Sequence, residues 1–229
     1  NLCAIFSLPA AEHLSRPYDR HISAASAVDI LQTRLGNYFQ PGDIRVILSD
    51  GIVSDAAAGG DYIKINQEAE FTEFDLQVLE VHEGWVHVGT TLNGRKQPWA
   101  SWLSVGSPRV TACQEGLETL TFSSYPRRAL KVSDRVVAVD MAEQGADFIE
   151  VYRFFSDRGL RAQECYKITQ RVFRGGTLRG GSVFTKDLSY LRGFVENVNF
   201  IRSSINSGVP EILPMLFVGK VTLDDIPIL

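Results

Sequence analysis

Apolar positions in the first part of the chain change from a helical to a strand spacing. Ile30, Leu31 and Leu35 follow "HISAASAVD" at helical intervals and Gly36 is a natural stop, so we predict a helix over residues 23–36. After the turn "QPGD", the β-rich runs "IRVILSD" and "DYIKI" predict two short strands. The small-residue stretch "AAAGGD" between them is expected to be a loop.

Helical spacing dominates the rest of the chain. The pair Thr72 and Asp75 resembles a helix cap, and Asn93-Gly94 is a natural end, so a helix is predicted over residues 73–92. Further helices are predicted over residues 111–128, 141–157, 160–173 and 186–206. The glycine-rich "RGGTLRGGSVF" before the last of them is read as a loop or hairpin. Because no repeat or low-complexity linker divides the chain, we expect one α+β domain of mostly helical content over residues 1–229, with a small β-sheet.

Composition narrows the class of protein without pointing to a function. Hydrophobic residues make up 45% and charged residues 22% of the chain, and the net charge of -4 provides no basic field for nucleic acid or an anionic membrane. No apolar run reaches the roughly 18 residues of a transmembrane helix. Three widely spaced cysteines without a CxxC pair favour reduced thiols and a cytoplasmic location. The chain begins at Asn1 without a basic leader region, so we expect a trimmed or processed chain rather than a retained signal peptide.

The stretch "VLEVHEGWVHVGT" holds the candidate chemistry. His82 and His87 are five residues apart, whereas zinc-binding histidines on a regular helix are four apart and differ by about 40° around the axis. At a spacing of five the difference is about 140°, and the two rings would point apart. A π-bulge would absorb the additional residue, and Gly84 lowers the cost of deforming that turn. We therefore predict a distorted helix between Glu83 and His87; the alternative is that both histidines have only structural roles.

A third ligand for such a site is offered by the next predicted helix. Glu115 in "TACQEGLETL" lies where the carboxylate of a His2Glu zinc site would be expected. Taken alone, Glu115 is an ordinary helix glutamate. Together with the histidine pair, Glu115 makes a zinc site one of two hypotheses. The other is that these residues have only structural roles.

These two motifs, in this order, resemble those of a known family. "LEVHEGWVHVGTTLNGRKQP", "QEGLETL", "YKITQRVFRGG" and "GGSVFTKDLSYLRGF" are similar to the bacterial flavohaemoglobin expression-modulating QEGLA motif proteins and to the microtubule-associated tyrosine carboxypeptidases. The likeness covers residues 45–205. It implies a zinc metallopeptidase fold with a bulged active-site helix and removal of a C-terminal residue from a peptide or protein. His82, His87 and Glu115 would then be the zinc ligands, and Glu83 the general base.

One residue departs from the family's string, which ends in alanine. Glu118 stands at that position, one helical turn beyond Glu115. It could support the site from outside, compete as a ligand or face solvent, and we expect the solvent-facing position.

A carboxypeptidase also needs a cation for the terminal carboxylate of its substrate. The stretches that resemble the family offer Arg171, Arg174, Lys186 and Tyr190, and the two arginines are spaced to share a helical face. The alternative is a solvated basic surface. Lys64 belongs to "DYIKIN", which could bind an extended substrate along a free edge or be an internal strand.

Two classes of function follow. The first is a zinc carboxypeptidase, and the second is a regulatory or binding protein with a structural or vestigial metal site. Glu83 favours the enzyme, because a structural zinc needs no base beside it. A phosphate-binding reading of "QRVFRGGTLRGGS" is disfavoured, since the stretch lacks the order of a phosphate loop.

Overall fold

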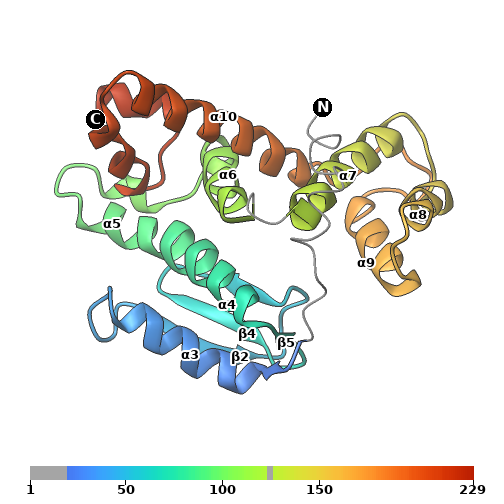
Figure 1. Cartoon of the computed structure of the whole chain (residues 1–229), viewed down its shortest axis with the longest axis horizontal. Coiled ribbons are helices and arrows are strands. Elements are labelled where there is room, and N and C mark those ends of the chain that lie inside the picture. Colours follow the sequence, from blue (N-terminus) through green and yellow to red (C-terminus); the bar gives the residue numbers. More distant parts are fainter. Residues whose placement is uncertain (1–19, 123–125) are drawn as a thin grey trace. The chain divides into compact units, whose positions relative to one another are not determined.

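The structure, a computed structural model, describes the backbone of residues 20–122 and 126–229 and the side chains of residues 20–120 and 132–229 (Figure 1). This part of the chain forms two compact units. The larger unit contains residues 20–121 and 193–229, and the smaller contains residue 122 and residues 126–192. That residues 1–229 act as one catalytic domain stays a prediction.

The larger unit combines a small sheet with helices, of which those marked η are 3₁₀ or π. Its elements are, in chain order, β1 (Ile22–Ser23), α3 (Ala24–Gly36), β2 (Arg45–Ser49), β3 (Ala56–Ala58), β4 (Tyr62–Asn66), β5 (Glu70–Phe71), α4 (Glu73–Leu79), η1 (Glu80–Gly89), α5 (Thr90–Lys96), η2 (Ser101–Ser104), η3 (Pro108–Val110), α6 (Thr111–Phe122), the end of α10 (Lys186–Asn206), η4 (Pro210–Phe217) and η5 (Leu223–Ile228). The predicted α+β class of mostly helical content is confirmed.

The three-stranded sheet has the order β2-β4-β3, with β2 parallel and β3 antiparallel to β4. Ile63 and Ile65 of β4 are fully buried, while Tyr62 and Lys64 on the other face are half-buried, as the alternation predicts. Because β4 is paired on both sides, the hypothesis that a free edge of "DYIKIN" binds an extended substrate is wrong. The loop predicted at "AAAGGD" is wrong in part as well: Ala56–Ala58 forms β3, since pairing with β4 overrides the weak strand propensity of alanine.

Helix α3 and the long helix formed by α4, η1 and α5 pack with this sheet (Figure 1). Leu31 and Leu35 of α3, Ile63 of β4, Leu76 of α4 and Val88 of η1 are fully buried in one core. Burying a leucine or isoleucine side chain stabilises a fold by about 1.5–3 kcal/mol. This core therefore fixes η1, which carries both histidines, against the rest of the unit.

The long helix begins where the cap predicts. The Thr72 hydroxyl accepts a hydrogen bond from the Asp75 amide at 3.0 Å, and the Asp75 carboxylate accepts one from the Thr72 amide at 2.9 Å. The predicted end at Asn93-Gly94 is wrong, because α5 continues to Lys96. A Cβ on Gly94 would lie 2.4 Å from the backbone of Leu103, so this glycine permits close packing on η2 rather than stopping the helix.

The smaller unit is helical in its described part. It contains α7 (Pro126–Glu143), α8 (Phe148–Asp157), α9 (Ala162–Val172) and the start of α10. The helices predicted over residues 160–173 and 186–206 are confirmed. "RGGTLRGGSVF" is a loop of turns, as predicted.

Two other predicted helices have wrong boundaries. Instead of one helix over residues 111–128, α6 ends at Phe122 and α7 begins at Pro126, a residue suited to the first helical turn. The helix predicted over residues 141–157 is divided, because the Asp147 carboxylate accepts hydrogen bonds from the amides of Ile149 and Glu150 at 2.9 Å and starts α8 anew. In the part of the chain that the structure describes, no helix is long and apolar enough to cross a membrane.

Candidate metal centre

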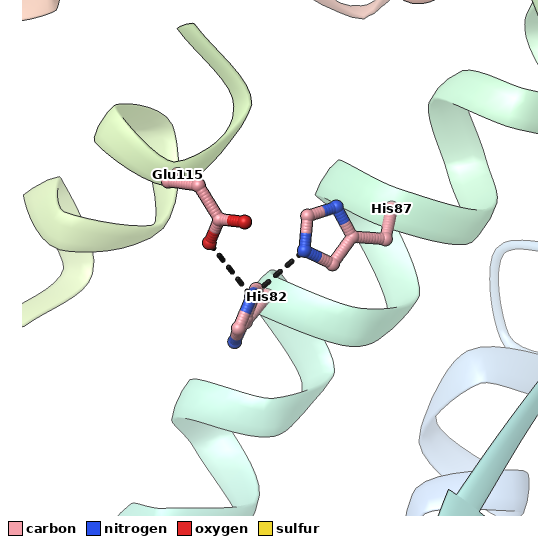
Figure 2. Close-up of side chains that lie close together, drawn as sticks. All are labelled: His82, His87 and Glu115. Carbon is pink, nitrogen blue, oxygen red and sulfur yellow. Dashed lines mark hydrogen bonds and ion pairs between the residues drawn. The ribbon is translucent and has the colours of Figure 1, made fainter. Parts of the chain in front are cut away.

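The helix that carries the histidine pair is π-helical from Glu80 to Gly89. The predicted distortion between Glu83 and His87 is confirmed, and it extends over ten residues rather than one turn. Hydrogen bonds that span five residues widen each turn by about one residue, which returns positions five apart to one face. His82 Nε2 and His87 Nε2 consequently face each other at 2.8 Å (Figure 2).

Gly84 has a packing role in this segment besides its flexibility. A Cβ at Gly84 would lie 2.5 Å from Leu35 Cδ2, so the missing side chain lets α3 pack directly against the π-helix. Gly89, at the end of the segment, lies close to the carbonyl of Gly84 and to Phe39. Both glycines thus let η1 pack closely against Leu35 and Phe39.

Glu115 reaches the same place from α6. Its Oε2 atom lies 3.8 Å from His82 Nε2, and one ligand atom from each of His82, His87 and Glu115 lies within 4.8 Å of the others (Figure 2). Glu115 is only 4% exposed. The structure therefore brings the three predicted ligands together.

A glycine crossing positions α6 for this contact. A Cβ on Gly116 would lie 2.1 Å from the backbone carbon of Gly193 in α10, so the two helices touch backbone to backbone. Asn197 of α10 donates a hydrogen bond from Nδ2 to the Cys113 carbonyl at 2.9 Å. The glycine beside Glu115 in the motif is thus required by helix packing, which the sequence alone did not indicate. Burial raises the pKa of the Cys113 thiol to about 12, so Cys113 is no nucleophile.

Glu83 lies beside the histidine pair and is 5% exposed. Its Oε1 atom lies 3.5 Å from His82 Nδ1, the ring nitrogen opposite the one that faces His87. The predicted base therefore borders the predicted ligands.

The expectation that Glu118 faces solvent is wrong. Glu118 is 5% exposed, and its Oε2 atom lies 3.1 Å from His82 Nε2. Residues three apart share a helix face, and the face of α6 that holds Glu115 is turned to the π-helix. Three carboxylates of this unit are therefore buried around the two imidazoles.

Lys220 is a neighbour of the site that sequence reasoning missed. Its Nζ atom donates hydrogen bonds to the His87 carbonyl at 2.8 Å and to Gln114 Oε1 at 3.0 Å, and Thr90 Oγ1 also contacts Gln114 Oε1 at 3.2 Å. Burial lowers the pKa of Lys220 to about 8, against the opposing charge of Glu115. Lys220 lies 133 residues from His87 in the sequence, so no local pattern could have found it.

The donor set fits zinc. Neutral imidazole nitrogens and a carboxylate are ordinary zinc ligands, and two nitrogens on one tetrahedral zinc lie about 3.3 Å apart. The 2.8 Å separation of the two Nε2 atoms requires an opening of about half an ångström to reach that spacing. His82, His87 and Glu115 could thus hold the ion, and the buried carboxylates supply the negative charge that a cation would neutralise.

A sequence model described as microtubule-associated tyrosine carboxypeptidase matches residues 1–229. The chain belongs to this family. No curated protein matches the chain. This match confirms the resemblance inferred from the two motifs. Membership of the family indicates a carboxypeptidase-like activity on a peptide or protein.

In this family member, the predicted substrate-binding residues other than Lys64 lie in the smaller unit. Arg171 makes a bidentate pair with Asp187, with Nε–Oδ2 and Nη2–Oδ1 distances of 2.9 Å. Burial alone would lower the pKa of Arg171, but hydrogen bonds and the charge of Asp187 raise it above its usual value. Asp187 is fully buried, and Arg135 lies 3.6 Å from it. The Tyr190 ring lies within 5.9 Å of the guanidinium carbons of both arginines.

The other candidates are more exposed. Arg174 lies beyond Phe173, the C-cap of α9, so the shared helical face predicted for the two arginines is wrong. Arg174 is exposed, and Lys186, also exposed, has its Nζ atom 5.8 Å from the Tyr190 ring centre. Lys64, in the larger unit, lies 5.7 Å from the ring centre of Tyr62. Their contact with substrate stays a prediction.

Proposed function

We propose that this protein is a zinc-dependent carboxypeptidase that hydrolyses the C-terminal residue from a peptide or protein. The proposal is carried by one observation, the convergence of His82, His87 and Glu115 with the buried Glu83 beside them. Membership of a family named for carboxypeptidase activity supports the same reaction.

Each residue has a role in this reaction. His82, His87 and Glu115 would hold the zinc, which when bound acidifies a water molecule and polarises a carbonyl. Glu83 would accept the proton of the attacking water and transfer it to the leaving amine. Its burial suits this task, because a carboxylate removed from bulk water interacts more strongly with nearby charge.

Lys220 would act on the site through the backbone. By donating to the His87 carbonyl and to Gln114, it ties the π-helix to α6, which carries Glu115. This bond pattern would keep the ligands in place when the substrate enters. Lys220 is accordingly a positioning residue in this proposal.

The terminal carboxylate of the substrate would be bound by cations of the smaller unit. Arg171, Arg135 and Lys186 all lie near the ring of Tyr190. Since Arg171 is already committed to Asp187, the exposed Arg174 and Lys186 are the better candidates for direct contact. Lys64 would contribute through its side chain, because the backbone of β4 is fully paired.

The experiment is to incubate the purified chain of residues 1–229 with a library of peptides and follow C-terminal trimming by mass spectrometry. Glu83→Gln should reduce trimming by roughly 100-fold or more while its zinc content, measured by elemental analysis, stays equal to that of wild type. Glu80→Gln, on the same helix and paired with Arg34 at 3.7 Å, is the matched control and should trim normally. Trimming by wild type that is absent, or trimming by Glu83→Gln that is undiminished, contradicts the proposal.

A further inference from the structure

We infer that Thr91 is a positioning residue of the proposed metal centre and acts on it through the main chain of His87. The Thr91 hydroxyl donates a hydrogen bond to the His87 carbonyl at 2.8 Å. The inference rests on the proposed function, in which His87 is a zinc ligand. It adds a residue of α5, the helix that follows the histidine pair.

The π-helix ends just before Thr91, and such an end leaves a carbonyl short of a backbone donor. In η1 an amide bonds the carbonyl five residues earlier, whereas in α5 it bonds the carbonyl four residues earlier. Where the first pattern changes to the second, two neighbouring carbonyls compete for one amide, so one of them needs another donor. The carbonyls of Val86 and His87 belong to this last turn of η1.

Side chains supply the missing donors at this junction. The buried Thr90 hydroxyl donates to the Val86 carbonyl. The His87 carbonyl accepts from the Thr91 hydroxyl, from Lys220 Nζ at 2.8 Å and from the amide of Thr90. Threonine hydroxyls that bond the carbonyl four residues earlier often bend a helix. These donors therefore stabilise the change from π to α geometry at this point of the chain.

The position of this junction decides where the His87 ring points. His87 Nε2 faces His82 Nε2 at 2.8 Å because the residues between them are π-helical. In a regular α-helix the two side chains would differ by about 140° around the axis. Thr91 is 7% exposed, which limits the access of water that could replace its hydroxyl. Loss of this hydroxyl should therefore loosen the turn that holds His87 in its ligand position.

The test compares the purified chain of residues 1–229 with its variants Thr91→Val and Thr91→Ser. Valine keeps the shape of threonine without the hydroxyl, whereas serine keeps the hydroxyl. Zinc affinity is measured by competition with a chromophoric chelator. We expect Thr91→Val to bind zinc roughly 10-fold more weakly, because partners that orient metal ligands are worth about 10–100-fold in affinity. Thr91→Ser should restore the wild-type affinity.

Thr33→Val is the matched control. The Thr33 hydroxyl donates to the Asp29 carbonyl at 2.8 Å, which is the same bond to the fourth preceding residue, but within the regular helix α3. This variant should bind zinc as wild type does. Circular dichroism of each variant establishes its fold. If Thr91→Val does not fold, Thr91→Ala, which removes the hydroxyl without adding a methyl group beside the carbonyl, takes its place.

A spectroscopic readout separates positioning of the ligand from a contribution to stability alone. The visible spectrum of bound cobalt depends on the geometry of its ligands. In cobalt-substituted Thr91→Val the bands should change in position or intensity, whereas Thr91→Ser and Thr33→Val should give the wild-type spectrum. A hydroxyl that only stabilised the fold would lower the free energy of unfolding and leave the cobalt spectrum of the folded protein unchanged.

The outcomes distinguish this inference from the proposed function. If wild type binds zinc and trims peptides, but the variant without the hydroxyl keeps the wild-type zinc affinity and cobalt spectrum, Thr91 is no positioning residue and the proposed function stands. If wild type binds no metal, both are contradicted. Weaker zinc binding and an altered cobalt spectrum, restored by serine, support the inference.

Discussion

Two clusters of buried charged side chains in the described part of the chain differ in the partners of their carboxylates. In the smaller unit, the buried Asp187 is paired with Arg171 and approached by Arg135. In the larger unit, buried glutamates such as Glu115 and Glu118 surround two imidazoles. The first cluster pairs its acid with arginines, whereas the second brings together side chains that could hold a metal ion.

This difference separates a structural pair from a binding site. A buried ion pair with bidentate geometry holds a fold in one arrangement, and removing one partner leaves an uncompensated charge. Imidazole nitrogens that converge with a carboxylate oxygen are typical of zinc centres.

The largest expected effect comes from removing the acid of the balanced cluster. Asp187→Ala should lower the free energy of unfolding by roughly 3 kcal/mol or more, because Arg171 is left partly buried without its partner. Urea unfolding followed by circular dichroism measures the change. Arg161→Ala, which removes an exposed partner of Glu164, is the control and should cost less than about 1 kcal/mol. An equally small loss for Asp187→Ala would mean that the pair is not structural.

A smaller effect is expected on catalysis when Arg174, a candidate for binding the substrate carboxylate, is replaced. Arg174→Ala should lower kcat/KM on peptides roughly 10-fold, mainly through KM, because a charge-assisted hydrogen bond to the substrate carboxylate is lost. Arg179→Ala, in the same glycine-rich loop and also exposed, serves as the matched control. Peptides with an amidated C-terminus should not distinguish Arg174→Ala from wild type. An unchanged KM for Arg174→Ala on free-acid peptides would remove this arginine from the proposal.

A pH-dependent effect concerns the cation beside the histidine and carboxylate cluster. The pKa of Lys220 is about 8 in the folded chain, below the usual value of 10.5, because of burial. Between pH 8 and pH 10.5, Lys220 of the metal-free protein is protonated in the unfolded state and largely deprotonated in the folded state. The free energy of unfolding of wild type should therefore rise with pH over this range relative to that of Lys220→Met. Below pH 8 lysine is protonated in both states, and the difference should be constant. Urea unfolding of the metal-free proteins from pH 7 to about pH 10 measures it, with Lys96→Met as the surface control. A difference that does not change with pH would show that Lys220 remains hydrated.

Local patterns predicted much of this molecule. The cap at Thr72, the helix over residues 186–206 and the alternation along β4 are short-range features, and the structure confirms them. The boundary at Asp147 was missed, since a break inside an apolar stretch depends on a few capping bonds that the periodicity does not record. The central position of β4 in the sheet could not be predicted from local patterns either, because strand pairing joins segments that are apart in the sequence.

The sequence by itself singled out His82, His87 and Glu115, the three residues that the structure brings together. A spacing of five between His82 and His87 requires a π-helical turn if both are to share an ion, and that requirement follows from helix geometry alone. Only the tertiary structure decided that Glu118 is turned to the histidines and that Lys220 holds the His87 carbonyl. Both depend on how α6 and the C-terminal segment pack against η1, and such packing is set by close contacts between distant segments, as at Gly116, rather than by any local pattern.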